Sequence, residues 1–274
     1  MVVAIVVLVA LVAAGLAWGW FEAGWLRRHV LEVEIAGLPT ELDGMRIAHL
    51  SDFHLGVVSP GSRATRDAVR WVADRRPDLV CVTGDLVSRR QGLGELQERL
   101  RELAPCFVVL GNHDFAASRD PFSQPIAPED LARIEGVCVL IDQSVEVAVR
   151  DRPVQLVGVD PRSYADRAAH PEELIDQSIS LRILLCHFPD IARTLPAGSF
   201  QLVLSGHFHA GQIVLPLPGR RLRLAHLGAR DVEGVYRHGD TTLHVSSGLG
   251  TTFVPFRFFA RPEVTELVVR SASR

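Results

Sequence analysis

The sequence predicts an α/β fold in which two packed β-sheets are flanked by helices. Early in the chain, apolar runs typical of buried strands alternate with segments of helical spacing. Beyond residue 209 the segments become short and β-like, and Gly and Pro turns separate them. The 274 residues are 47% hydrophobic, which is enough for a sizeable core. Because an apolar face must be buried against another layer, this order of elements favours sheet packed on sheet with helices outside.

The N-terminal segment predicts a membrane-spanning helix. Residues 1–21 carry no charged side chain after the terminal amine. Their apolar run matches the roughly 20 residues that a helix needs to cross a bilayer. Trp18, Trp20 and Trp25 cluster at the far end of the run, as in the aromatic belt of a membrane interface.

A cleaved signal peptide is the alternative interpretation of this segment. It requires a basic region ahead of the apolar run and small residues at a cleavage site behind it. No basic residue precedes the run, and the stretch WGWFEAGW that follows is bulky. A twin-arginine export signal does not fit either, because Arg27 and Arg28 lie behind the run. We therefore predict an uncleaved transmembrane anchor over residues 1–26 and one globular domain over residues 27–274.

The same arginine pair predicts the orientation in the membrane. Positively charged residues beside a span accumulate on the cytoplasmic side. Arg27 and Arg28 therefore place the globular domain on the cytoplasmic side of the inner membrane, as a single-pass protein. We expect residues 1–28 to anchor the chain without contributing to a functional site, because every motif described below lies beyond residue 50.

Apolar periodicity and its breaks predict the elements of the globular domain. For example, Ala68, Val69 and Val72 form an apolar helical face that ends before Pro77. We predict helices at 62–75, 93–103, 128–135 and 171–179. We predict strands at 31–39, 46–50, 79–83, 106–110, 137–141, 145–149, 154–159, 181–185, 200–205, 213–217, 221–225, 234–238, 241–246 and 264–269. The stretch 115–127 is predicted to be a mobile loop.

Five short polar motifs each follow an apolar run that predicts a buried strand. In an open α/β sheet, ligands bind outside the carboxyl ends of the strands, so we expect these motifs to converge on one rim. The motifs are Asp52-Phe53-His54, Gly84-Asp85, Gly111-Asn112-His113-Asp114, Cys186-His187 and Gly206-His207-Phe208-His209.

The donor atoms in these motifs predict a two-metal centre. Carboxylates, imidazoles and an amide oxygen suit a borderline divalent ion such as Mn, Fe or Zn. The candidate metal ligands are Asp52, His54, Asp85, Asn112, His187, His207 and His209. Asp85 has two oxygens and can bridge two ions. Two such ions hold a bridging hydroxide and clamp the phosphate oxygens of an in-line displacement, so no side-chain nucleophile is needed.

Two further residues of the third motif are candidate catalytic residues. His113 is free to act as a general acid or to stabilise the leaving oxygen, and Asp114 could orient it. Any single histidine here fits a solvent or core role. The whole cluster does not, because unpaired charges gathered at a sheet rim would destabilise the fold without a cation. His49 lies inside a predicted strand and is interpreted as structural, whereas His170 is expected to be exposed.

The motifs resemble those of the calcineurin-like metallophosphoesterase superfamily, which has D-x-H, G-D, G-N-H-[DE], H and G-H-x-H in this order. The resemblance covers roughly residues 45–270. It implies a four-layer sandwich of two mixed β-sheets flanked by helices. It also implies a division of ligands into two groups with Asp85 as the bridge. Asp52, His54 and His209 would bind one ion, and Asn112, His187 and His207 would bind the other.

A finer resemblance points to a bacterial subgroup of membrane-associated phosphodiesterases. The shared blocks are an N-terminal apolar segment, SDFHLG, GHFHAGQI and a tail resembling VSSGLGTTFVPFRFFARPEVTEL. One branch of this subgroup hydrolyses UDP-2,3-diacylglucosamine, a precursor of lipid A. The resemblance implies a phosphorylated small-molecule or lipid substrate, reached at the membrane through the N-terminal helix.

The aromatic tail has two interpretations. Phe253, Val254, Phe256, Phe258 and Phe259 could form an apolar lip that meets acyl chains or the bilayer. Packing in a β-core is the interpretation we favour, because large apolar side chains are more often buried. The arginines in this run, at 257 and 261, could meet a phosphate, although exposure at the surface is the commoner outcome for arginine.

Composition limits the other classes of function. The net charge is −3, and the sequence has no basic tract, so no nucleic-acid partner is expected. The four cysteines lie in apolar runs and form no C-x-x-C pair, which favours core packing over a zinc or redox site.

We therefore expect a membrane-anchored, metal-dependent hydrolase of phosphoester or pyrophosphate bonds. The alternatives are the same chemistry on soluble nucleotides or phosphoproteins, and a catalytically silent scaffold. The complete set of candidate ligands disfavours the scaffold.

Overall fold

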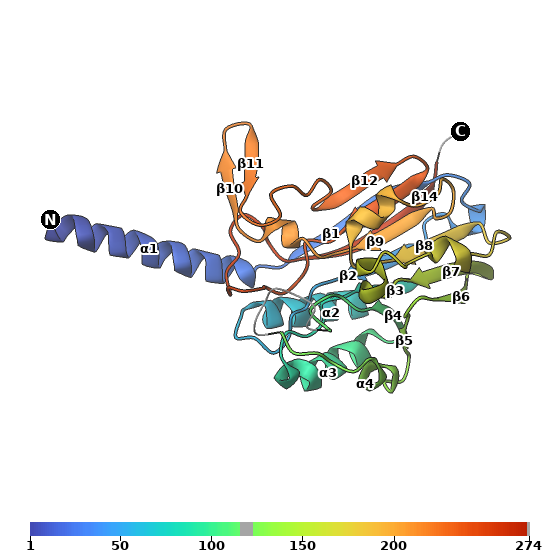
Figure 1. Cartoon of the computed structure of the whole chain (residues 1–274), viewed down its shortest axis with the longest axis horizontal. Helices are drawn as coiled ribbons and strands as arrows, with labels where there is room; N and C mark the ends of the chain where they lie inside the picture. Colours follow the sequence, from blue (N-terminus) through green and yellow to red (C-terminus); the bar gives the residue numbers. More distant parts are fainter. Residues whose placement is uncertain (116–122, 273–274) are drawn as a thin grey trace.

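Two six-stranded mixed sheets pack face to face in a computed structural model of the chain. The structure describes residues 1–115 and 123–272. Helices α2 and α3 cover the outer face of one sheet, and helix α1 extends away from the body (Figure 1). The predicted sandwich of two mixed sheets preceded by one apolar helix is confirmed.

The first sheet carries three of the five motifs at strand ends. Its order is β1-β14-β2-β3-β4-β5, in which β14 is antiparallel to β2 and the other neighbours are parallel. The strands are β1 (Arg27–Ile35), β14 (Glu263–Ser271), β2 (Arg46–Leu50), β3 (Leu79–Thr83), β4 (Cys106–Val109) and β5 (Val137–Val139). Because β2, β3 and β4 run in parallel, the segments that follow them meet at one edge.

The second sheet carries the other two motifs. Its order is β12-β13-β9-β8-β7-β6, with parallel pairing from β13 to β7 and antiparallel strands at both edges. The strands are β12 (Gly234–His238), β13 (Thr241–Val245), β9 (Leu202–Ser205), β8 (Leu181–Leu185), β7 (Arg152–Gly158) and β6 (Gln143–Val149). Strands β8 and β9 end beside the motifs of the first sheet.

Strands buried on both faces explain the continuous apolar runs in the sequence. All five residues of β3 and all five of β8 are buried. Between the sheets, Ile47 and Cys81 pack with Ile183 and Leu204 in one core cluster.

The outer faces of the sheets are covered unequally. On the first sheet, α2 (Gly61–Arg75) and α3 (Leu93–Leu103) bury apolar residues at helical spacing, among them Val69 and Leu100. On the second, short helices such as α5 (Pro161–Ala165) and the 3₁₀ turns Pro171–Leu174 and Pro189–Arg193 form a thin layer. Helix α4 (Pro128–Ala132) precedes β5.

Several predicted elements differ from the structure in their bounds; for example, the helix predicted over 128–135 ends at Ala132. Two differences have a clear physical cause. The helix predicted over 171–179 is wrong, because only a 3₁₀ turn forms before residue 175. The Gln155 side chain hydrogen-bonds Leu174 O and Asp176 N, and Asp176 accepts from Ser178, so these polar contacts replace the helical ladder. Strand β1 begins at Arg27, earlier than predicted, because it pairs with β14 along its whole length.

Helix α1 (Val2–Ala23) is the N-terminal apolar segment. It is 22 residues long, and it is long and apolar enough to cross a membrane. At about 1.5 Å per residue it matches a hydrocarbon core of about 30 Å. Its C-terminal end meets the domain near the hairpin of β10 (Val214–Leu217) and β11 (Arg220–Arg223) (Figure 1).

Candidate metal centre

The five motifs converge where the two sheets meet. They follow the C-terminal ends of β2, β3, β4, β8 and β9. Backbone hydrogen bonds join neighbouring turns: Asp52 N donates to Gly84 O at 2.9 Å, and His54 N donates to Asp85 O at 3.0 Å. The predicted rim is therefore formed by backbone pairing that continues beyond the strands.

The turns that carry these residues are strained. Positive φ angles occur at Asp52, His54, Asp85, His207 and His209. Such angles are uncommon outside glycine and cost about 1–3 kcal/mol each, so they persist where surrounding structure enforces them, often at functional sites. Here each angle turns a strand end sharply, which directs the side chain towards the junction of the sheets.

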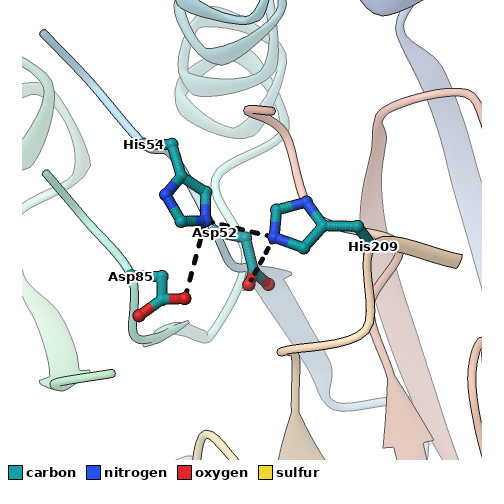
Figure 2. Close-up of side chains that lie close together, drawn as sticks. All are labelled: Asp52, His54, Asp85 and His209. Atoms are coloured by element: carbon teal, nitrogen blue, oxygen red, sulfur yellow. Dashed lines mark hydrogen bonds and ion pairs between the residues drawn. The ribbon is translucent and has the colours of Figure 1, made fainter. Parts of the chain in front are cut away.

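The first group of side chains comprises Asp52, His54, Asp85 and His209. Their candidate ligand atoms all lie within 4.8 Å of one another. Figure 2 shows the side chains converging: His54 Nε2 lies 3.5 Å from Asp85 Oδ2 and 3.1 Å from His209 Nε2, and His209 Nε2 lies 3.3 Å from Asp52 Oδ1. All four residues are buried. This arrangement can hold one cation.

The second group shares Asp85 with the first. Asp85, His187 and His207 also place ligand atoms within 4.8 Å of one another. His187 Nε2 lies 3.2 Å from Asp85 Oδ2 and 3.3 Å from His207 Nδ1. Two groups with one common carboxylate can hold two neighbouring cations.

Asn112 provides a separate test of whether a cation fits. Its Oδ1 is buried and has no hydrogen-bond partner among the residues that the structure describes. An unsatisfied buried carbonyl oxygen destabilises a fold by about 1–3 kcal/mol. A divalent ion would satisfy this oxygen together with the clustered imidazole nitrogens. The donor set of the site therefore fits the predicted metal ions.

Outer contacts orient three of the histidines. His54 Nδ1 is 2.9 Å from Ser88 Oγ, and His187 Nδ1 donates to Thr83 O at 2.8 Å. His209 Nδ1 lies 3.2 Å from a guanidinium nitrogen of Arg257. In each case the Nε2 atom is directed inward. Ser88 Oγ and Thr83 O can accept from the second ring nitrogen of His54 and His187, as in metal sites where an outer acceptor fixes the ring. The Arg257 guanidinium has no acceptor atom, so it lies against the His209 ring without filling that role.

Asp85 is the most strongly anionic group of the site. Burial would raise its pKa, but His187, His113 and His54 hold the pKa of Asp85 well below its usual range. Burial raises the pKa of Asp52 to about 7. Burial would lower the pKa of His187, but Asp85 outweighs it and raises this pKa to about 9.

His113 faces the same centre from the loop after β4. Its Nε2 lies 4.0 Å from Asp85 Oδ2, and its Nδ1 lies 2.7 Å from Ser123 Oγ. Ser123 therefore holds the ring, a contact that no sequence motif indicated. A ring fixed at one nitrogen can present the other to a substrate.

Asp114 joins two loops of the site. Its Oδ1 accepts hydrogen bonds from Leu86 N (2.8 Å) and Val87 N (3.1 Å), and its Oδ2 accepts one from Gly111 N (2.9 Å). Burial and the charge of Asp85 raise the pKa of Asp114 to about 7. These contacts support a positioning role for Asp114, and its predicted orientation of His113 stays a prediction.

Comparison with known proteins identifies the family. The family model described as calcineurin-like phosphoesterase matches residues 45–211. The chain belongs to this family. Its activity class is therefore that of a metal-dependent phosphoesterase, as the resemblance of the motifs implied.

Relatives of this phosphoesterase occur in bacteria and animals. An uncharacterised metallophosphoesterase of Bacillus subtilis (strain 168), YkoQ, is 29% identical over 84% of this chain and 84% of its own length. The phosphodiesterase YaeI of Escherichia coli (strain K12) is 28% identical over 91% of this chain and 88% of its own. A Danio rerio transmembrane protein with a metallophosphoesterase domain is 30% identical over 88% of this chain and 57% of its own. Helix α1 and the name of the last relative indicate membrane association.

A cavity of about 770 Å³ opens onto the metal centre of the phosphoesterase. Asp85, Asn112, His113, His207 and His209 line its floor. Its walls are mainly apolar and aromatic. Phe115, Thr252 and Phe253 come from the predicted loop and the aromatic tail. The other wall residues were indicated by no motif: Pro161, Arg162, Ala165, Asp166, Phe188 and His226. Part of the loop predicted over 115–127, residues 116–122, lies outside the described residues.

The aromatic tail differs from the interpretation that we favoured. Phe253, Val254 and Phe259 are 60%, 39% and 50% exposed, so core packing is wrong for these three residues. Arg257, expected at the surface, is fully buried and donates to backbone carbonyls of Ser247 and Gly250 among others. The tail therefore places aromatic side chains outside and a cation inside.

The remaining residues singled out in the sequence are located as follows. His49, interpreted as structural, is buried on β2 between His244 Nδ1 (2.7 Å) and Thr83 Oγ1 (2.8 Å). His170 is exposed, as predicted. The cysteines at 81, 106 and 186 are buried, and the one at 138 is half-buried.

Proposed function

We propose that this phosphoesterase uses two divalent ions to hydrolyse a phosphoester or pyrophosphate bond in a lipid-linked substrate. Asp52, His54 and His209 would hold one ion, and Asn112, His187 and His207 the other, with Asp85 shared. The supporting observation is that two groups of converging ligand atoms have Asp85 in common. Manganese, iron and zinc all suit this donor set.

The chemistry divides between the ions and the protein. When bound, two ions lower the pKa of water and stabilise charge on the phosphoryl oxygens. His113, held by Ser123, would protonate the leaving oxygen. The walls of the cavity, with Phe115, Phe188 and Phe253, would contact the substrate beside the reacting bond.

Two observations support a substrate that carries a lipid. The aromatic wall of the cavity continues into the exposed Phe253 and Val254. The loop that carries these residues is hydrogen-bonded to the last turn of α1, since Arg257 N donates to Gly19 O at 3.0 Å. The cavity mouth would therefore lie near the membrane surface. UDP-2,3-diacylglucosamine, the substrate of one branch of the subgroup that the finer motifs resemble, has both the pyrophosphate bond and the acyl chains.

The proposed location is the inner membrane, with residues 1–26 as a single-pass anchor and the domain of residues 27–274 on the cytoplasmic side. Helix α1 and the arginine pair that follows it support this topology. The alternative of a soluble nucleotide or phosphoprotein substrate uses the same metal centre and differs in the use of the exposed aromatic residues.

Substrate competition tests the proposal. The full chain, purified in detergent and loaded with Mn²⁺, is given UDP-2,3-diacylglucosamine in mixed micelles, UDP-N-acetylglucosamine, and bis-p-nitrophenyl phosphate. We expect the lipid-linked compound to have a kcat/KM at least about tenfold above the sugar nucleotide. Phe253→Ser should lower only the lipid rate, whereas Val235→Ser, a change at a 44% exposed site on β12, should change neither. Faster turnover of the soluble nucleotide would favour the alternative.

A further inference from the structure

The β10–β11 hairpin separates its side chains into two faces. The register places Leu215 opposite Leu222 and Leu217 opposite Arg220. Because alternate residues of a strand share a face, Leu215, Leu217 and Leu222 lie together. Leu224 continues this face, since its N donates to Ile213 O at 2.9 Å. We call Leu215, Leu217, Leu222 and Leu224 the leucine face; these residues are 36–51% exposed.

The opposite face is turned towards the protein. Arg221 hydrogen-bonds Phe259 O, and both Arg221 and Arg223 pair with Glu233. The Arg223 side chain also packs on Gly211, where an added Cβ would lie 2.8 Å from it. With the arginine face held against the body, the leucine face is directed outward.

The leucine face belongs to the part of the molecule from which α1 emerges. In Figure 1 the hairpin projects from the end of the domain where α1 is attached, and α1 and the hairpin point in different directions. Leu224, Phe253 and Val254 line one small cavity, so the leucine face is continuous with the exposed aromatic tail. The exposed Arg220 at the hairpin turn suits lipid phosphates.

We propose that the leucine face lies in the interfacial layer of the bilayer that α1 crosses. This inference rests on the proposed membrane location. The occupant is a lipid surface because the apolar residues adjoin a helix of spanning length and carry a cation at their edge, as interfacial segments do. The hairpin would fix the rotation of the domain on the membrane and hold the cavity mouth against the lipid headgroups.

Site-directed fluorescence tests this contact in the full chain. In a Cys138→Ser background, Leu215→Cys, Val235→Cys and Val9→Cys are each labelled with an environment-sensitive dye in nanodiscs that hold one chain. Leu215 is the tested site, and Val235 is its matched control, because the two side chains are 42% and 44% exposed. Val9 reports whether α1 lies in the membrane. Lipids that carry a nitroxide near the headgroup should quench the label at 215 at least about threefold more than the label at 235, and lipids that carry a nitroxide on the acyl chain should quench the label at 9.

Each outcome decides between the possibilities. Quenching at 9 without quenching at 215 would overturn the hairpin contact and leave the anchor standing. A lack of quenching at 9 by the acyl-chain nitroxide would overturn the membrane location and the hairpin contact together. A blue-shifted but unquenched label at 215 would place the leucine face against protein and contradict a lipid partner.

A second inference comes from hydrogen bonds between α1 and the loop 246–262. Gly19 O accepts from Arg257 N at 3.0 Å, and Glu22 Oε1 accepts from Ala260 N at 2.9 Å. Glu22 is 2% exposed, and its other oxygen accepts from Trp18 Nε1 at 3.0 Å. The last turn of the predicted anchor is therefore part of the domain's packing.

Arg257 connects this contact to the metal centre. Its guanidinium donates to Gly250 O (2.6 Å), Ser247 O (2.9 Å) and Ala260 O (2.9 Å), and lies 3.2 Å from His209 Nδ1. The segment that it holds touches the turn after β2, because Gly250 N donates to Asp52 O at 2.6 Å.

We infer that Arg257 and Glu22 are positioning residues for the metal group of Asp52, His54 and His209. The end of α1 would support the loop 246–262. Arg257 would hold that loop through its carbonyls, and the loop in turn contacts the Asp52 turn and lies beside the His209 ring. The expectation that residues 1–28 contribute nothing to the site does not fit these contacts. A chain from which the anchor has been removed would therefore lose part of the support for one group of metal ligands.

Metal binding measures this role directly. Mn²⁺ titration of the full chain, followed by electron paramagnetic resonance, should show one of two ions bound about 10–100-fold more weakly in Arg257→Lys and Glu22→Leu, the usual effect of removing an outer partner. Glu22→Gln keeps the acceptor oxygen and should restore affinity. Arg182→Leu is the control, since Arg182 is 7% exposed and also donates to backbone carbonyls, at Ile179, Gly198 and Ser199.

The comparison with Arg182→Leu separates positioning from stability. If Arg182→Leu weakens metal binding as much as Arg257→Lys, the effect is general loss of folding and the inference is wrong. Wild-type affinity for both ions in Arg257→Lys and Glu22→Leu would also overturn it.

Discussion

The two halves of the metal centre differ in how they are supported and in what they face. In the half with Asp52, His54 and His209, only His209 lines the cavity. In the half with Asn112, His187 and His207, both Asn112 and His207 line it. The first half is contacted by the loop 246–262, which is hydrogen-bonded to the end of α1, whereas the second opens towards the cavity. We therefore predict that the first half binds its ion more firmly and that the second half admits the phosphate.

Asp85 belongs to both halves, so its change should have the largest effect. We expect Asp85→Asn to abolish hydrolysis of bis-p-nitrophenyl phosphate, because the amide cannot supply two anionic oxygens to two cations. Activity is compared with Asp78→Asn, which changes a surface carboxylate paired with Arg150. Near-normal turnover of Asp85→Asn with two bound ions would contradict the shared position.

His113 tests the open side of the centre. We expect His113→Asn to keep both ions but lose about 10²–10⁴ in rate, the contribution of a positioned proton donor. The loss should shrink for leaving groups of low pKa, which need less protonation. His226→Asn, another change in the cavity wall, should cost less than about tenfold. Loss of an ion from His113→Asn would instead identify a ligand.

Metal binding should stabilise the protein more as pH rises. Without added metal, the raised pKa of Asp52, about 7, means that the fold favours its neutral form. This contribution to stability is therefore lost as pH rises from about 4 through 7. The raised pKa of His187, about 9, likewise means that an ion must displace a proton at neutral pH.

Thermal unfolding at pH 5.5, 7 and 8.5 checks this competition. We expect the increase in Tm between EDTA and Mn²⁺ to grow over this series, because fewer protons compete for the ligand atoms. An increase that is constant or falls with pH would contradict the buried carboxylate and imidazole ligands.

Local patterns in the sequence were sufficient to predict much of the fold. The helix predicted over 93–103 and the strand predicted over 234–238 have these bounds in the structure. The convergence of Asp52, Asp85 and His207 followed from apolar runs that end in polar residues, because parallel strands bring their carboxyl ends together.

Contacts from distant segments explain what the sequence did not reveal. The helix predicted over 171–179 is interrupted by hydrogen bonds to the Gln155 side chain, which comes from strand β7. Arg257 is buried because the carbonyls of 247–260 surround it and α1 covers its loop. Ser123 contacts His113 from a part of the sequence that shows no apolar periodicity. Single-residue propensity contains no signal for such contacts.

The number and coupling of bound metal ions test the shared role of Asp85 most directly. The full chain is loaded with Mn²⁺, its metal content is measured, and its electron paramagnetic resonance spectrum is recorded. We predict two ions per chain and the spectrum of a spin-coupled pair, which Asp85→Asn converts to that of an isolated ion. One ion per chain, or two ions without coupling in the unmodified protein, would contradict a dinuclear centre bridged by Asp85.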